Sequence, residues 1–223
     1  MADTRIQKVS DVARRLFITE GYSRTQIRDI AKSAGISVGA VYLLFENKKV
    51  ILDFVLKCGI DPAFLAQSHE LPITQDAFPS LQNELMAAFY KKGIQLAEPL
   101  TSGAQGYSYE DLLSDSYDII SEYGDCSLIF ENNPQGCGKL GPFYIQYRAR
   151  FFDTFMRFIK IYMERGELRE LQLPEYSVQL MIETMYYWGS RVLFFDLSDQ
   201  QPLSPDERKL VCMDALIHAY MRG

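Results

Sequence analysis

Residues 25–42 read TQIRDIAKSAGISVGAVY, and this stretch predicts two short helices joined by a tight turn. Apolar side chains recur at i, i+3, i+4 and i+7 from Ile27, which is the spacing of one helix face. Thr25 is a candidate N-cap, Gly35 suits the left-handed conformation just past a helix end, and Ser37 can cap the second helix. Two short helices with such a turn have the proportions of a helix-turn-helix, whose second helix lies in the major groove of DNA.

The second helix of this pair needs an anchored face and a free one. Val41 and Phe45 lie at the right spacing to anchor it, which would leave its other face open to a partner. Periodicity alone leaves open whether Val38 and Leu44 face the core or the outside.

The rest of the sequence predicts more helices and no convincing alternating strands, so the expected class is all-α. A first helix ends at Gly21, and Asn47 can cap a fourth helix that stops before Gly59. Short pieces and loops are expected at 59–78 and 99–109, and helices at about 80–97, 110–122, 125–132, 142–166, 174–197 and 204–222. The segment 174–197 is apolar nearly all round, which predicts burial on more than one side. Ser204 and Glu207 form a capping box at the start of the last helix.

The net charge of −6 is distributed unevenly along the chain. Residues 1–57 carry 10 Lys and Arg against 6 Asp and Glu, whereas residues 58–223 carry 13 against 23. A basic head and an acidic body predict an anionic partner for the head alone.

Composition also excludes several classes of protein. The hydrophobic content of 48% excludes a disordered chain, and four scattered cysteines exclude a disulfide-rich mini-protein and favour reduced thiols in the cytosol. The first residues carry no apolar run typical of a secretory signal, and charged residues interrupt the most apolar stretch, 180–197. We therefore expect a cytoplasmic protein with no membrane partner.

Together with Phe45 and the NKK of residues 47–49, the segment 25–42 resembles the TetR family of bacterial transcriptional regulators. The resemblance is specific over roughly residues 5–57 and only architectural beyond. It implies a three-helix DNA-binding domain over residues 1–47 and a helical effector-binding and dimerisation domain over 48–223. In that second domain, residues 48–58 would form a connecting helix and 174–222 the dimer helices.

The resemblance also implies a function and a set of partners. These are a homodimer, usually a repressor, a palindromic operator in double-stranded DNA, and a small-molecule effector that releases the protein from it. Aromatic side chains in the body favour a hydrophobic or aromatic effector. No cofactor and no enzymatic activity are expected.

Position by position, the family pattern assigns DNA contacts to individual residues. Thr25 and Gln26 would touch phosphates, and Arg28 would read a base, because Arg can pair with guanine through two hydrogen bonds. Tyr42 and Lys48 would contact phosphates. The start of the recognition helix would lie at the groove floor, with the residues Ser37, Val38, Gly39 and Ala40. Leu44 departs from the polar or aromatic residue common in the family, which puts a side-chain contact there in doubt.

Two further sets of residues are candidates for the body of the protein. An effector cavity between helices could be lined by Phe89, Tyr123, Tyr147, Phe151, Glu183, Met185 and Trp188, although core packing is the simpler interpretation of each aromatic residue. Glu183 could pair with a cationic ligand or with Arg148. A two-fold helical bundle could be formed by Ile182, Tyr186, Gly189, Val192, Leu193, Leu210, Met213, Ile217 and Tyr220.

Other chemistry has weaker support in the sequence. Residues 136–141 match the G-x-G-x-x-G pattern of nucleotide binders, but such a site needs a strand before it, and only Ser127–Phe130 could supply one. A nucleotide-binding enzyme that uses this loop, and a regulator without a small-molecule effector, remain as alternatives. His69 and His218 are the only histidines, which gives metal sites and histidine-based catalysis few candidates. Cys126 and Cys137 could form a redox switch or simply be inert.

Overall fold

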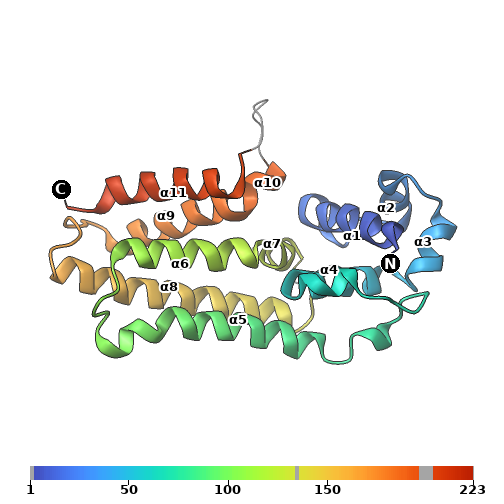
Figure 1. Ribbon diagram of the computed structural model, residues 1–223, viewed down its shortest axis with the longest axis horizontal. Coiled ribbons are helices and arrows are strands. Elements are labelled where there is room, and N and C mark those ends of the chain that lie inside the picture. The colour runs from blue at the N-terminus through green and yellow to red at the C-terminus, as the bar shows by residue number, and fades with distance from the viewer. Residues whose placement is uncertain (1–2, 134–135, 196–202, 223) are drawn as a thin grey trace. The chain divides into compact units, whose positions relative to one another are not determined.

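The computed structural model describes residues 3–133, 136–195 and 203–222, and every regular element in these ranges is a helix (Figure 1). The predicted all-α class is confirmed. The α-helices are α1 (Thr4–Leu16), α2 (Ile27–Ala34), α3 (Val38–Leu44), α4 (Lys48–Ile60), α5 (Leu81–Ala97), α6 (Tyr109–Glu122), α7 (Gly124–Asn132), α8 (Leu140–Glu164), α9 (Pro174–Tyr186), α10 (Val192–Phe195) and α11 (Pro205–Tyr220). Short 3₁₀ helices occur at Pro62–Ala66, Gln75–Ala77 and Glu98–Ser102.

The chain folds as two compact units. The first comprises Met1–Ala88 and Asp125–Phe143, and the second Phe89–Gly124 and Tyr144–Gly223. The first unit therefore extends past residue 47, where the sequence places the end of a DNA-binding domain. That functional division stays a prediction.

Local capping signals define the helices of the first unit. Ser37 Oγ accepts a hydrogen bond from the backbone N–H of Ala40, and Asn47 Oδ1 accepts one from that of Val50, at 3.1 and 3.0 Å. Both caps were expected from the sequence. The N-cap of α2 is Gln26, not the predicted Thr25, because the Thr25 hydroxyl is buried and donates to the Gly21 carbonyl at 2.9 Å.

The first predicted helix changes form before its end. α1 stops at Leu16, and a wider π-helical turn, Phe17–Gly21, carries the chain to Gly21. Gly21 has φ +90°, a conformation that favours glycine, and ends the element as predicted. Apolar residues of α1, α2 and α4 fill the core around it, among them Val9, Ala13, Ile30, Val50 and Phe54.

The second unit buries one large apolar cluster, built mainly from α6, α8, α9 and α11 (Figure 1). Tyr109 of α6, Phe155 and Tyr162 of α8, and Met181 of α9 are buried in it. The aromatic residues of the long helix α8 therefore supply much of this core, and charged residues such as Asp153 and Lys160 lie on its exposed side.

The predicted helix 174–197 is interrupted in its second half. α9 ends at Tyr186, and a π-helical turn follows over Tyr187–Arg191 before α10. The turn is held against α6, because Ser190 Oγ donates to the Ile120 carbonyl and the Tyr117 hydroxyl donates to the Trp188 carbonyl, both at 3.2 Å. Residues 196–202 of the expected dimer helices lie outside the described residues. No helix in the described ranges has both the length and the apolar character needed to cross a membrane.

The register of α11 differs from the expected stripe of Leu210, Met213, Ile217 and Tyr220. The buried residues of α11 are Arg208, Cys212, Leu216 and Tyr220, which are spaced at intervals of four. Leu210 is 68% exposed, whereas Met213 and Ile217 are half-buried. The capping box at Ser204 forms as predicted, with its hydroxyl oxygen accepting from the Glu207 backbone N–H at 3.3 Å.

Candidate functional site

Helix α3 presents one face to the core of its unit and another to the outside. Val41 and Leu44 are fully buried, and so is Phe45, which follows the helix. Val38 is 41% exposed and Leu43 is 67% exposed on the outer side. The question left open by periodicity is therefore answered: Val38 faces outward and Leu44 inward.

Leu43 is a surface residue that the sequence did not single out. Periodicity could have found it, because Val41, Leu44 and Phe45 form one stripe and Leu43 falls between its members. The outer face of α3 thus consists of small residues near its start and two large side chains, Tyr42 and Leu43, near its end.

The turn before α3 is held by backbone geometry. Gly35 has φ +68°, and its N–H donates to the Lys32 carbonyl while that of Ile36 donates to the Ala31 carbonyl, at 3.2 and 3.1 Å. No neighbouring atom would touch a Cβ at Gly35, so the glycine is required by its conformation rather than by space. This turn fixes the angle at which α3 follows α2.

The residues before and within α2 divide between surface and core. Gln26 and Arg28 are exposed, and the Arg28 guanidinium lies 3.9 Å from the Asp29 carboxylate. Thr25 is buried. Of the two residues expected to touch phosphates here, only Gln26 therefore presents its side chain on the surface.

Lys48, at the start of α4, acts as a tie between segments of the first unit. Its ammonium donates to the Tyr22 carbonyl at 2.7 Å and the Thr25 carbonyl at 2.8 Å, and lies 4.2 Å from the centre of the Tyr22 ring. Burial lowers the pKa of Lys48. An ammonium has three N–H donors, so one remains for another acceptor.

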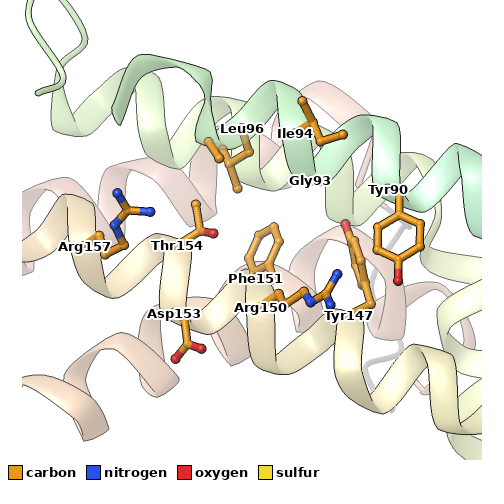
Figure 2. A pocket seen from close by; sticks show the side chains of 11 residues that line it. Tyr90, Gly93, Ile94, Leu96, Tyr147, Arg150, Phe151, Asp153, Thr154 and Arg157 are labelled. Atoms are coloured by element: carbon orange, nitrogen blue, oxygen red, sulfur yellow. The ribbon is translucent and has the colours of Figure 1, made fainter. Parts of the chain in front are cut away.

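A cavity of about 300 Å³ lies between α5 and α8 in the second unit (Figure 2). Its lining is Tyr90, Gly93, Ile94, Leu96, Ala97, Tyr147, Arg150, Phe151, Asp153, Thr154 and Arg157. Two of the candidate effector residues, Tyr147 and Phe151, line it. Burial and the neighbouring tyrosines raise the pKa of Tyr147, so its phenol stays neutral at physiological pH.

The other effector candidates do not line this cavity. Phe89 stacks on Tyr123 with ring centres 4.9 Å apart, and Met185 is fully buried in the core. The Trp188 carbonyl accepts a hydrogen bond from the Tyr117 hydroxyl. Glu183 forms an ion pair with Arg148, with the two charged groups 2.9 Å apart. Of the two partners expected for Glu183, the structure contains the arginine.

An apolar outer face runs along α9 and α11. Leu180 is 58% exposed, and Tyr176 and Leu210 more so. Of the residues expected in a dimer interface, Leu193 and Leu210 are exposed, Ile182, Val192, Met213 and Ile217 are half-buried, and Tyr186, Gly189 and Tyr220 are buried within the chain. This face therefore offers large apolar side chains to a partner.

The glycine-rich loop at 136–141 lacks the context of a nucleotide-binding motif. Ser127–Phe130, the only candidate strand before it, lies within helix α7. Residues 136–140 instead line a second cavity, of about 530 Å³, together with parts of α4 and the start of α5. In the described part of the chain, no three His, Cys, Asp or Glu side chains could together hold a metal ion.

The cysteines are free thiols in buried or half-buried positions. Burial raises the pKa of Cys58 to about 12 and that of Cys137 to about 11, and raises that of Cys126 as well. These thiols are therefore protonated at neutral pH and poor nucleophiles, which argues against the redox interpretation of Cys126 and Cys137.

Comparison with known proteins finds similarity in the N-terminal part of the chain. The sequence model described as bacterial regulatory proteins, tetR family, matches residues 10–54. The HTH-type transcriptional repressor KstR2 of Rhodococcus jostii strain RHA1 is 37% identical over 60 residues, which are 27% of this chain and 29% of that protein. KstR2 of Mycobacterium tuberculosis strain ATCC 25618 / H37Rv is 30% identical over 87 residues, 39% of this chain and 44% of that one. The chain thus matches less than half the length of these curated relatives.

Solved structures extend the likeness to the whole fold. The ketosteroid transcriptional regulator KstR2 of Mycobacterium tuberculosis superposes with a TM-score of 0.57 and 14% identity, covering 100% of this chain and 98% of that one. The probable transcriptional regulatory protein RHA5900 gives 0.58 and 16%, covering 96% and 97%. At these identities the likeness concerns the fold alone. The similarity to the TetR family of bacterial regulatory proteins is thus carried by the N-terminal residues 10–54.

Proposed function

We propose that this chain is a cytoplasmic regulator of transcription that represses by binding a palindromic operator as a homodimer. A small-molecule effector that enters the body releases it from the DNA. The support is the match of residues 10–54 to the tetR family model and the arrangement of surfaces around that segment.

The observation that carries the proposal is the outer face of α3. Three buried side chains, Val41, Leu44 and Phe45, fix the helix to its unit, while Val38 and Tyr42 stay exposed. Gly39 and Ala40 are small, so the backbone can approach the edges of the bases closely. A helix of this kind after a rigid turn is suited to the major groove.

Each proposed contact has a distinct role. Gln26, Tyr42 and the remaining donor of Lys48 would bind phosphates, which supplies affinity without sequence information. Ser37 at the start of α3 would lie near the groove floor. Arg28 would read a base, because its side chain is 74% exposed and can form two hydrogen bonds with guanine.

A dimer is proposed through the apolar outer face of α9 and α11. Two-fold symmetry would pair this face with its copy and remove Tyr176, Leu180 and Leu210 from water. It would also hold two recognition helices at the spacing of about 34–36 Å that successive major grooves require. An effector that binds better to a body with another spacing would shift the population away from DNA.

The test is binding of the purified protein to DNA from upstream of its own gene. We expect sequence-dependent binding whose affinity falls steeply as salt rises, because phosphate contacts release counterions. Tyr42→Ala should weaken binding to all sequences. Arg28→Ala should reduce the preference for the operator over a scrambled duplex, by about 1–3 kcal/mol for one bidentate base contact.

Lys160→Ala is the matched control, since it removes one exposed cation from α8. It should leave both affinity and preference unchanged. Absence of salt-sensitive, sequence-dependent binding would contradict the proposed function. Equal loss on operator and scrambled DNA for Arg28→Ala would refute only the base-reading role.

A further inference from the structure

The cavity between α5 and α8 combines apolar walls with an arginine at each end, Arg150 and Arg157. Phe151 and Tyr147 of α8 and Leu96 of α5 form most of the floor, and Gly93 leaves space on the α5 side. At about 300 Å³ the cavity lies at the lower end of ligand pockets, which hold about 300–1,000 Å³. A small ligand with a flat apolar body matches these walls.

Arg157 and Thr154 form a polar end of this cavity. They lie three positions apart on α8, so they are neighbours on one face of the helix. In the described part of the chain no carboxylate lies within ion-pair distance of Arg157, and no hydrogen bond engages the Thr154 hydroxyl. Figure 2 shows both side chains at the same end of the cavity, with Thr154 between Arg157 and Phe151.

The opposite end of the cavity already has its contact. The Arg150 guanidinium lies 5.5 Å from the centre of the Tyr90 ring, a distance at which cation and ring attract. Arg150 and Arg157 are seven residues apart, about 10 Å along the helix axis. A small anion bound at Arg157 would therefore be too far from Arg150 to contact both guanidinium groups.

The local charge favours an anion over a cation. Helix α8 carries four basic and two acidic residues, although the whole chain has a net charge of −6. Asp153 is the one acidic residue in the lining, and Figure 2 shows its carboxylate directed away from α5. A guanidinium that borders an apolar wall can bind a carboxylate through charge-assisted hydrogen bonds.

We propose that the α5–α8 cavity binds a small aromatic carboxylate, with its carboxylate on Arg157 and Thr154 and its ring on Phe151. This assigns a chemical class to the effector, and its regulatory meaning rests on the proposed function. The binding itself does not depend on DNA, so it is tested separately.

The experiment measures binding of 2-naphthoate to the full-length protein by calorimetry and by thermal shift, without DNA. The neutral 2-naphthamide and the cationic 2-naphthylmethylamine have the same ring system and test the charge requirement. We expect naphthoate to bind and raise Tm, and each of the other two probes to bind at least tenfold more weakly. A charge-assisted hydrogen bond accounts for about a tenfold to hundredfold difference in affinity.

Three variants locate the site. Arg157→Gln should weaken naphthoate binding about tenfold to hundredfold, and Thr154→Val about two- to tenfold, because a neutral hydroxyl contributes less. Gly93→Leu should abolish binding by filling the cavity. A Cβ at Gly93 would meet Tyr147 at 3.6 Å, an ordinary contact, and leucine is favoured over glycine in a helix, so this variant should keep its fold.

Lys160→Gln is the control for general charge, because it removes a cation on α8 outside the lining. It should bind naphthoate within twofold of the wild type. Equal binding of naphthoate and naphthamide, or unchanged naphthoate binding in Gly93→Leu with a retained Tm, would overturn the proposal. No naphthoate binding in a protein that still binds operator DNA would also overturn it while sparing the proposed function. Naphthoate binding by a protein that binds no DNA would support the ligand site and contradict the proposed function.

Discussion

The exposed face of α3 and the exposed face of α9 and α11 differ in chemistry. α3 offers small residues near its start and two large side chains, Tyr42 and Leu43, near its end, so backbone groups and one hydroxyl remain within reach of a partner beside a single large aliphatic side chain. α9 and α11 offer large apolar side chains, with Leu180 and Leu210 more than half exposed. The first surface suits a hydrated, charged partner, and the second suits a partner that removes it from water.

The difference teaches that exposure alone does not identify a partner. Both faces are anchored by buried residues on the opposite side of their helices, such as Val41 in α3 and Met181 in α9. What separates them is the kind of side chain left outside. The predictions that follow test this difference one surface at a time.

The largest effect is expected from Leu210→Glu on the apolar face. Pairing of this face would bury the new carboxylate without a partner, which costs several kcal/mol. The dimer dissociation constant, measured by sedimentation equilibrium, should rise at least about a hundredfold, a change of about 2.7 kcal/mol. Ala149→Glu, at an exposed site on α8, is the matched control and should leave it unchanged. If both variants assemble as the wild type does, the apolar face is not the dimer interface.

Two glycines next to α3 should separate folding from binding. Gly35→Ala places a side chain at φ +68° and should cost about 1–2 kcal/mol, lowering Tm by about 2–8 °C. Gly39→Ala has a Cβ that would lie 3.9 Å from Ser37 Oγ, so Tm should stay the same or rise slightly. If α3 binds DNA as proposed, the affinity for operator DNA should fall, because the added methyl group would stand between the backbone and the bases. A loss of Tm in Gly39→Ala with no loss of DNA binding would contradict this assignment.

Removal of the α3 cap should have a smaller effect on stability. Ser37→Ala loses the hydrogen bond from the Ala40 N–H and should cost about 1 kcal/mol in urea unfolding. Ser37→Thr keeps a hydroxyl and should recover most of it. An unchanged unfolding midpoint in Ser37→Ala would mean that the cap does not stabilise the helix.

The smallest effect is expected at Glu183 of α9. Its ion pair with Arg148 joins two partly exposed side chains, at 39% and 46%, so water screens it. Glu183→Gln should change stability by less than about 1 kcal/mol, and the double variant with Arg148→Gln should show little coupling. A larger coupling would assign this pair a structural role beyond that of a surface contact.

Local rules in the sequence were enough to predict three of the caps and the turn, although the N-cap of α2 is Gln26 and not the predicted Thr25. Ser37, Asn47 and Ser204 each accept a hydrogen bond from the backbone N–H three residues later, and Gly35 adopts a positive φ that favours glycine. Such signals depend only on neighbours in the chain. The all-α class followed from another local signal, the helical spacing of apolar residues along the chain.

Features that depend on packing between segments were not predicted. The inward stripe of α11 runs through Cys212 and Leu216 because those positions meet α6 and α9, and the π-helical turn at Tyr187–Arg191 follows its bonds to α6. Arg157 is exposed and also borders a cavity formed with α5, which the sequence did not indicate. The spacing of apolar residues within one helix does not show which other helix will pack against it.

The bonds of Lys48 have a mechanical consequence. One ammonium fastens two carbonyls of the segment before α2 to the first turn of α4. A displacement of the start of α4 would therefore also move the segment before α2, because these two hydrogen bonds connect the segments directly. Helix α4 and the segment before α2 would move together. A small displacement of α4 would then be enough to shift the proposed recognition surface out of register with a DNA groove.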